Sequence, residues 1–173
     1  MDPAGNTFPV AVPLAKAAVL ALSLPYPNAL HYPTLRAAAQ SVMAELCAQG
    51  EQDEAQFRDA LFRLVMLHGV MPTVSDRHFL AEPGERPRAH ALARIQAATP
   101  GGVVSGARHV AMDMDAPGRE LLTLLDGSHT PEELVSLMHA RLPDSGLSLT
   151  REQVDTLTRR QLWLFARQAL MAG

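Results

Sequence analysis

The sequence predicts a mainly α fold with short β strands, arranged as two winged-helix-like three-helix units in tandem. Apolar residues recur at helical spacing through most of the chain, whereas residues 109–115 alternate with a period of two, which is typical of a strand. Both halves place a histidine and a proline where a helix begins, first His31 and Pro33 and then His129 and Pro131. Three helices beside a short extended segment correspond to a winged helix, and the alternative is a coincidence between two amphipathic three-helix runs.

The first half is expected to form three helices. Prolines favour a first helical turn and disfavour a helix interior, so Pro13 begins the first helix and Pro25 ends it. Gly69 is the expected C-terminal stop of the third helix. The predicted elements are helices over 13–24, 33–50 and 53–68, a short extended segment over 70–74 and an exposed loop over 75–88.

The second half is expected to combine one half-buried strand with several helices. In the strand, Val110, Met112 and Met114 are predicted to face the core. Asp115 can cap the helix that follows, and Thr130 begins another helix with the sequence of a capping box. The predicted elements are a short helix over 89–98, the strand over 109–115 and helices over 116–125, 131–141 and 150–170.

These elements predict three segments along the chain. Residues 1–82 are expected to form an N-terminal helical winged-helix-like unit. Residues 83–107, which begin with Pro83 and Gly84, are expected to form a linking segment with a short helix. Residues 108–173 are expected to form a C-terminal winged-helix domain.

Composition excludes several function classes. The chain has 173 residues, 47% of them hydrophobic and 19% charged, so it can bury a packed core. Its formal net charge of -3 disfavours non-specific binding to nucleic acid. The single cysteine, Cys47, excludes an internal disulfide framework and a Cys-based structural zinc site. The apolar stretch over 10–24 is interrupted by Pro13 and Lys16 and is too short to span a membrane, so we expect a cytoplasmic protein.

No residue pattern nominates a catalytic, cofactor-binding or metal-binding side chain. The seven histidines form no i, i+4 pair and are interpreted as residues of helix ends and strand edges. Cys47 lies late on an amphipathic helix, away from the helix N-terminus that would activate a thiol. Asp113 and Asp115 share one face of the strand, where a solvated edge and a helix cap explain them better than a bound cation. The sequence contains no glycine-rich phosphate loop, so we expect no cofactor and no enzymatic activity.

DNA binding is also disfavoured by the distribution of cations. A helix that enters a DNA groove normally carries several lysines or arginines. The helix over 33–46 carries Arg36 alone, and the helix over 131–141 sets Arg141 against two glutamates. The final helix has four arginines, but acidic and apolar residues lie among them. We therefore expect no nucleic-acid partner.

Three runs in the second half resemble one protein family. They are residues 86–97 (RPRAHALARIQA), 103–109 (VVSGARH) and 121–130 (LLTLLDGSHT). Together they resemble the region that follows the catalytic domain in bacterial SAM-dependent methyltransferases of the outer-membrane-protein lysine methyltransferase type. In that family the region comprises a methyltransferase regulatory part and a C-terminal winged-helix domain. The first half resembles the family more loosely, through residues 25–32 and 67–71.

The resemblance implies an accessory role, because the catalytic SAM-binding domain of the family is absent from this sequence. Residues 105–107 and 128–129 also depart from the family pattern. The stretch from Leu124 to Leu134 is similar to small winged-helix peptide chaperones, such as the precursor-binding protein of the pyrroloquinoline quinone pathway. Those domains bind a peptide by adding a strand to a sheet edge, which residues 108–115 could offer here. Asp126 and Gly127 are interpreted more simply as a helix C-terminal cap.

We therefore predict a non-catalytic regulatory or protein-substrate-recognition module of a bacterial SAM-dependent methyltransferase. Its expected partner is a methyltransferase catalytic domain or a protein or peptide substrate. The alternatives are a stand-alone peptide-binding winged-helix module, then a winged-helix transcription regulator and last a cryptic enzyme. The residues predicted to contact a partner are Arg94, Arg108, His109 and Asp113.

Overall fold

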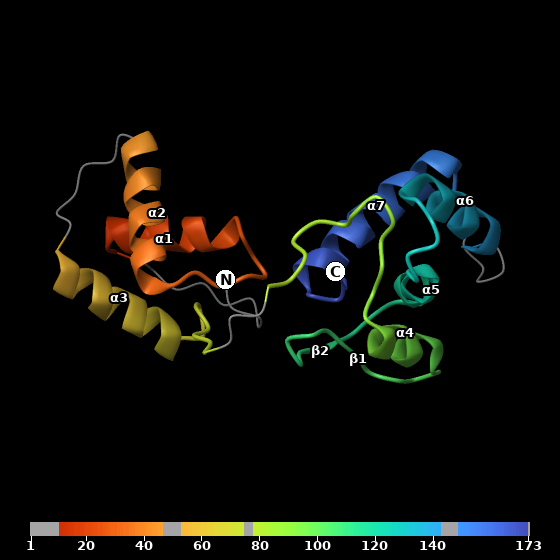
Figure 1. Cartoon of the computed structure of the whole chain (residues 1–173), viewed down its shortest axis with the longest axis horizontal. Helices are drawn as coiled ribbons and strands as arrows, with labels where there is room; N and C mark the ends of the chain where they lie inside the picture. The colour runs from red at the N-terminus through yellow and green to blue at the C-terminus, as the bar shows by residue number, and fades with distance from the viewer. Residues whose placement is uncertain (1–10, 47–52, 75–77, 143–148, 173) are drawn as a thin grey trace. The chain divides into compact units, whose positions relative to one another are not determined.

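Helices dominate the structure. The computed structural model describes residues 11–46, 53–74, 78–142 and 149–172. Within these ranges the strands form one two-stranded sheet. The chain divides into two compact units, Met1–Arg77 and His78–Gly173, which are described in turn (Figure 1). The predicted fold class, mainly α with short β strands, is confirmed.

The residues of the first unit that the structure describes form three helices. They are α1 (Pro13–Ser23), α2 (Tyr32–Glu45) and α3 (Glu54–Met66). Pro13 occupies the first turn of α1, as predicted. The buried face of α1 consists mostly of alanines, whose small side chains allow the close crossing of α1 and α2 in Figure 1. Phe57 and Leu64 of α3 complete this core.

A polar cluster ties α3 to the start of α2. The hydroxyl of Tyr32 donates to a carboxylate oxygen of Glu54 over 2.7 Å. Arg36 and Arg58 reach the same carboxylate with N–O distances of 2.8 and 2.9 Å. The ring of Tyr32 also packs on that of Phe57, with centroids 5.9 Å apart. Buried aromatic contact and a shared carboxylate therefore join α2 and α3.

Helix α3 ends in a Schellman motif. Gly69 N–H donates to Leu64 O over 2.8 Å and His68 N–H donates to Val65 O over 3.0 Å. His68 takes the left-handed position, with φ of 57°, and the predicted stop Gly69 follows it. Residues 70–74 belong to no strand, and no strand lies in the described part of the first unit. A winged-helix architecture for this unit therefore remains a prediction.

In its described residues the second unit has four helices and two strands. They are α4 (Ala91–Ala98), β1 (Val104–Ser105), β2 (Ala111–Met112), α5 (Ala116–Leu124), α6 (Pro131–Arg141) and α7 (Arg151–Arg167). The predicted caps are present: Asp115 accepts from Gly118 N, and Thr130 forms its capping box with Glu133. A second capping box begins α7 at Thr150.

The segment before α4 lies between the ends of α5 and α7. Arg88 and Asp126 form one antiparallel bridge, and Ala89 and Met171 form another. The backbone hydrogen bonds of this arrangement are Ala89 N–Leu125 O (2.8 Å), His90 N–Leu170 O (2.9 Å) and Ala172 N–Arg88 O (2.7 Å). The start of α4 is thereby tied to the ends of two helices far along the chain.

The core of the second unit extends into the segment that we expected to be a link. Ala89, Ala93, Ala97 and Val104 are buried together with side chains of α5, α6 and α7. The largest fully buried side chains in the unit include Phe165 and several leucines. Residues 83–107 therefore take part in the packing of the unit that follows.

The predicted strand is shorter than expected, and its partner strand was not anticipated. Only Ala111 and Met112 of residues 109–115 form a strand, paired antiparallel with β1 in the register Val104↔Met112. Met112 packs against the core as predicted, but Val110 is 53% exposed. The reason is local: His109 has φ of 58°, which turns the chain before Val110 can enter the sheet.

Arg119 fixes the end of α4. Its guanidinium donates to the carbonyls of Gln96 (2.8 Å), Thr99 (2.6 Å) and Gly102 (2.7 Å). Gln96 lies in the last turn of α4, where carbonyls lack partners within the helix, and Thr99 and Gly102 follow the helix end. Arg119 adds a side-chain donor to each of these carbonyls. Arg119 therefore holds the turn that leads from α4 into β1.

We expect Arg119→Met to lower the free energy of unfolding of the second unit by ~1–3 kcal/mol, because partly buried carbonyls lose charged donors. Trp163, the only tryptophan, lies in this unit, so urea unfolding followed by its fluorescence reports on this unit. Arg160→Met, a change at an exposed position of α7, is the matched control and should shift stability by less than ~0.5 kcal/mol. Equal shifts in the two variants would show that the Arg119 bonds contribute nothing.

Candidate functional site

The four predicted contact residues fall into two places in the second unit. Arg108 and His109 lie in the loop between β1 and β2, and Asp113 follows β2 as an exposed residue. Arg94 lies on α4 and its charge acts on Asp126, which follows α5. The structure therefore assigns three of the candidates to the hairpin and the fourth to the turn after α5.

The turn after α5 is organised around Asp126. Its carboxylate accepts hydrogen bonds from the hydroxyl and the backbone N–H of Ser128, and these bonds, with the nearby charge of Arg94, lower the pKa of Asp126. Arg86 donates to the carbonyl of Ser128 from the other side. Gly127 has φ of 86°, a conformation that glycine adopts without steric cost. These contacts make the turn a fixed connection into the capped start of α6.

The hairpin loop is also anchored. Ser105 N–H donates to the side-chain oxygen of Gln96 on α4 over 3.0 Å. Ala107 N–H donates to Ala169 O over 2.9 Å, which ties the loop to the end of α7. His109 N–H closes a tight turn onto Gly106 O over 2.9 Å. The charged side chains of the hairpin therefore project from a backbone held at several points.

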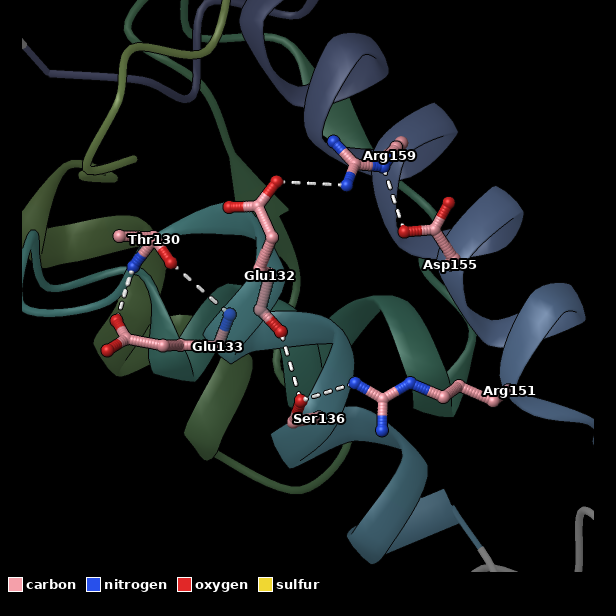
Figure 2. A network of polar contacts seen from close by, with 7 residues as sticks. All are labelled: Thr130, Glu132, Glu133, Ser136, Arg151, Asp155 and Arg159. Atoms are coloured by element: carbon pink, nitrogen blue, oxygen red, sulfur yellow. Dashed lines mark hydrogen bonds and ion pairs between the residues drawn. The ribbon is translucent and has the colours of Figure 1, made fainter.

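A second polar cluster joins α6 to α7 (Figure 2). Arg159 bridges two carboxylates, with Nη2 3.0 Å from Glu132 Oε1 and Nε 2.8 Å from Asp155 Oδ1. Arg151 donates to the hydroxyl of Ser136 over 3.3 Å, and that hydroxyl donates to the carbonyl of Glu132 over 3.1 Å. Figure 2 shows Arg151 and Arg159 of α7 directed toward α6.

These side chains line a shallow groove of about 450 Å³. Its walls are Glu132 and Val135 on α6 and Arg151, Glu152 and Asp155 on α7. The hydrogen bond from Arg159 lowers the pKa of Glu132, and the same contact raises the pKa of Arg159. Glu132 is therefore ionised at neutral pH and cannot serve as a proton donor. The ionised carboxylates of the groove can accept hydrogen bonds from a partner.

The sequence indicated only part of this groove. The four-residue spacing of Asp155 and Arg159 is the signal of an ion pair within one helix. The pairing of Arg159 with Glu132 depends on the packing of α6 against α7, which no local pattern predicts. In the sequence, Arg151 and Arg159 are distinguished only as cations of the final helix.

The described ranges contain neither a metal-ligand cluster nor a membrane-spanning helix. No group of three or more histidine, cysteine, aspartate or glutamate side chains there is placed to hold a metal ion. In the same ranges no helix is both long enough and apolar enough to cross a bilayer.

One family model matches the second unit. Residues 85–170 match the family model described as "PKMT, C-terminal winged helix domain". This confirms the resemblance predicted from residues 86–97, 103–109 and 121–130. No curated protein matches the chain.

Two solved structures share the fold. PKMT2 from Rickettsia typhi in complex with AdoHcy has a TM-score of 0.71 and 17% sequence identity, covering 92% of this chain and 34% of that one. Another structure of PKMT2 from Rickettsia typhi has a TM-score of 0.68 and 18% identity, with the same coverage. The chain therefore spans about a third of the length of the solved proteins that it matches.

The ion pair of Glu132 predicts an acid-sensitive stability. Because its pKa in the folded state lies below the ordinary value of 4.5, its contribution is present above about pH 4.5 and is lost as pH falls further. The urea midpoint from Trp163 fluorescence should decrease as the pH is lowered from about 6 to about 3. The decrease should be smaller in Glu132→Gln. Glu152→Gln removes a groove carboxylate but keeps the ion pair between Glu132 and Arg159. Its urea midpoint should therefore change with pH as that of the parent protein does. Identical pH profiles for the parent and Glu132→Gln would contradict this assignment.

Proposed function

We propose, on the premise that residues 85–170 belong to the PKMT C-terminal winged helix domain family, that the chain is a non-catalytic module of a bacterial SAM-dependent methyltransferase. In this role it holds a protein substrate, or the catalytic domain, as a substrate-recognition or regulatory part. The observation that carries the proposal is the family match, because it covers all of α4 to α7.

The chain matches only part of the length of PKMT2, which supports separate roles for the matched and unmatched parts. The chain corresponds to 34% of PKMT2, a protein whose structure was solved with AdoHcy. AdoHcy is what remains of the methyl donor SAM after it has transferred its methyl group. We assign the cofactor chemistry to the remaining two thirds of such an enzyme and a recognition role to the part that this chain represents.

The hairpin is the surface that we assign to recognition. Arg108, His109 and Asp113 carry donors and acceptors on a loop whose backbone is tied to α4 and α7. A rigid loop loses little conformational entropy when a partner binds. Arg94 acts from a separate place, beside the turn that contains Asp126.

A stand-alone peptide-binding module is the second candidate. The observation that favours it is the small β1–β2 sheet, since a sheet edge can accept an additional strand. Each strand has only two residues, which limits the number of main-chain bonds that a peptide can make. The methyltransferase module therefore remains the favoured function, and a transcription regulator ranks below both.

Methyl transfer tests the proposal. Labelled SAM is incubated with the catalytic domain of the methyltransferase of the same organism, with and without this chain, on a protein substrate and on a short lysine peptide. The chain should raise transfer to the protein substrate by ~10-fold or more, because a second binding site raises the effective concentration of the substrate. Transfer to the short peptide should stay unchanged.

The results on the two substrates separate a substrate-recognition role from a regulatory role. An equal rise on both substrates would assign a regulatory role, and no rise on either would reject the module. Arg108→Ala and Arg94→Ala should weaken the effect without changing stability, whereas Arg63→Ala on α3 is the matched control. An equal loss of stability in Arg94→Ala or Arg108→Ala would mark these residues as internal supports.

A further inference from the structure

Arginine supplies nearly all of the basic side chains of this protein. Of its 15 lysine and arginine residues only one, Lys16, is a lysine, and it lies on the exposed side of α1 in the first unit. Residues 78–173, which form the second unit, contain many arginines and no lysine. The unit to which we assign recognition therefore presents no side chain with a primary amine.

The shape of the guanidinium explains part of this preference. Arg119 donates to three carbonyls, and Arg159 bridges the carboxylates of Glu132 and Asp155. These contacts use several N–H groups of one planar guanidinium at once, which the compact ammonium of a lysine does not offer in the same geometry. Packing within the unit therefore selects arginine at these positions.

Contacts do not explain the arginines at two other positions. The side chains of Arg88 and Arg160 are exposed, and within the part of the chain that the structure describes neither has an ion pair or a hydrogen bond. The carbon stem of Arg88 lies beside Gly127, a contact that the stem of a lysine would make as well. The folded unit therefore does not itself require arginine at these two positions.

Lysine and arginine differ as acceptors of a methyl group from SAM. A lysine ammonium first releases a proton to solvent. The lone pair of its nitrogen then bonds to the methyl carbon while the bond between that carbon and the sulfonium sulfur breaks, which leaves AdoHcy and a methylated ammonium. Lysine, with an ordinary pKa of about 10.4, can release that proton, whereas arginine, with a pKa above about 12, stays protonated. An exposed lysine beside a transfer centre would therefore compete with the substrate.

We propose that the second unit works within reach of the methyl-transfer centre, and that arginine at its exposed positions keeps the unit from being methylated in place of the substrate. The inference rests on the proposed function, with a lysine of the protein substrate as the acceptor. It extends that function by assigning the second unit to the neighbourhood of the centre. The face of α1 that carries Lys16 lies outside that neighbourhood, which is why a lysine is tolerated there.

The test introduces a lysine at each unpartnered position. Arg88→Lys and Arg160→Lys keep the charge and should leave the urea midpoint from Trp163 fluorescence unchanged. Each full chain is incubated with SAM, a protein substrate and the catalytic domain of the methyltransferase of the same organism, then digested and measured by mass spectrometry. The introduced lysine should be methylated ~10-fold or more above Lys16 of the same chain, because proximity to the centre raises its effective concentration.

Lys16 is the internal control, since it is an exposed lysine in the same molecule. Methylation of one variant alone supports the proposal and assigns that residue to the side nearer the centre. The proposal is overturned if neither introduced lysine is methylated while the substrate is, or if Lys16 is methylated to the same extent.

The result is separate from the test of the proposed function, which measures transfer to the substrate. A chain that raises that transfer while its introduced lysines stay unmodified keeps the proposed function and loses this inference. Methylated introduced lysines without any rise in substrate transfer would reject the recognition role and leave the second unit within reach of the centre.

Discussion

The packing of the second unit depends on the backbone pairing of residues 88–90 with the ends of α5 and α7. Ala89 and His90 donate to carbonyls near the ends of the two helices, and Arg88 accepts from Ala172. These bonds satisfy polar groups that would otherwise be buried without partners. They also bring the start of α4 onto a core built mainly by α5, α6 and α7. The pairing therefore places the alanine face of α4 against this core.

That constraint decides which surfaces remain for function. Once α4 covers the core, the hairpin extends from its end and is held by Gln96 and by the end of α7. The buried face of α7 is committed to the core, which leaves Trp163 and its neighbours to solvent. Because Glu132 and Asp126 have lowered pKa values, the polar clusters keep fixed charges at neutral pH. Fixed charge on rigid backbone is suited to recognition of a partner.

Local patterns predicted the helices well, while contacts between distant residues escaped them. Asp115 and Thr130 cap helices as expected, since a cap involves only residues within one turn. Strand β1 was not predicted because its two residues form no alternating pattern, and it is a strand only by pairing with β2. Likewise, neither the bonds from Arg119 to the end of α4 nor the pairing of Arg159 with Glu132 has a sequence signal. The proximity of Arg94 to the Asp126 turn also depends on packing and has no signal in the sequence.

The central claim is that this chain contributes recognition and leaves the cofactor chemistry to another part of a methyltransferase. Calorimetric titration of the purified chain with S-adenosylmethionine tests that division most directly, because it requires no partner and no substrate. The account predicts no saturable heat of binding. Stoichiometric binding with a micromolar Kd would contradict it, since a cofactor site would then exist in a chain without a glycine-rich phosphate loop.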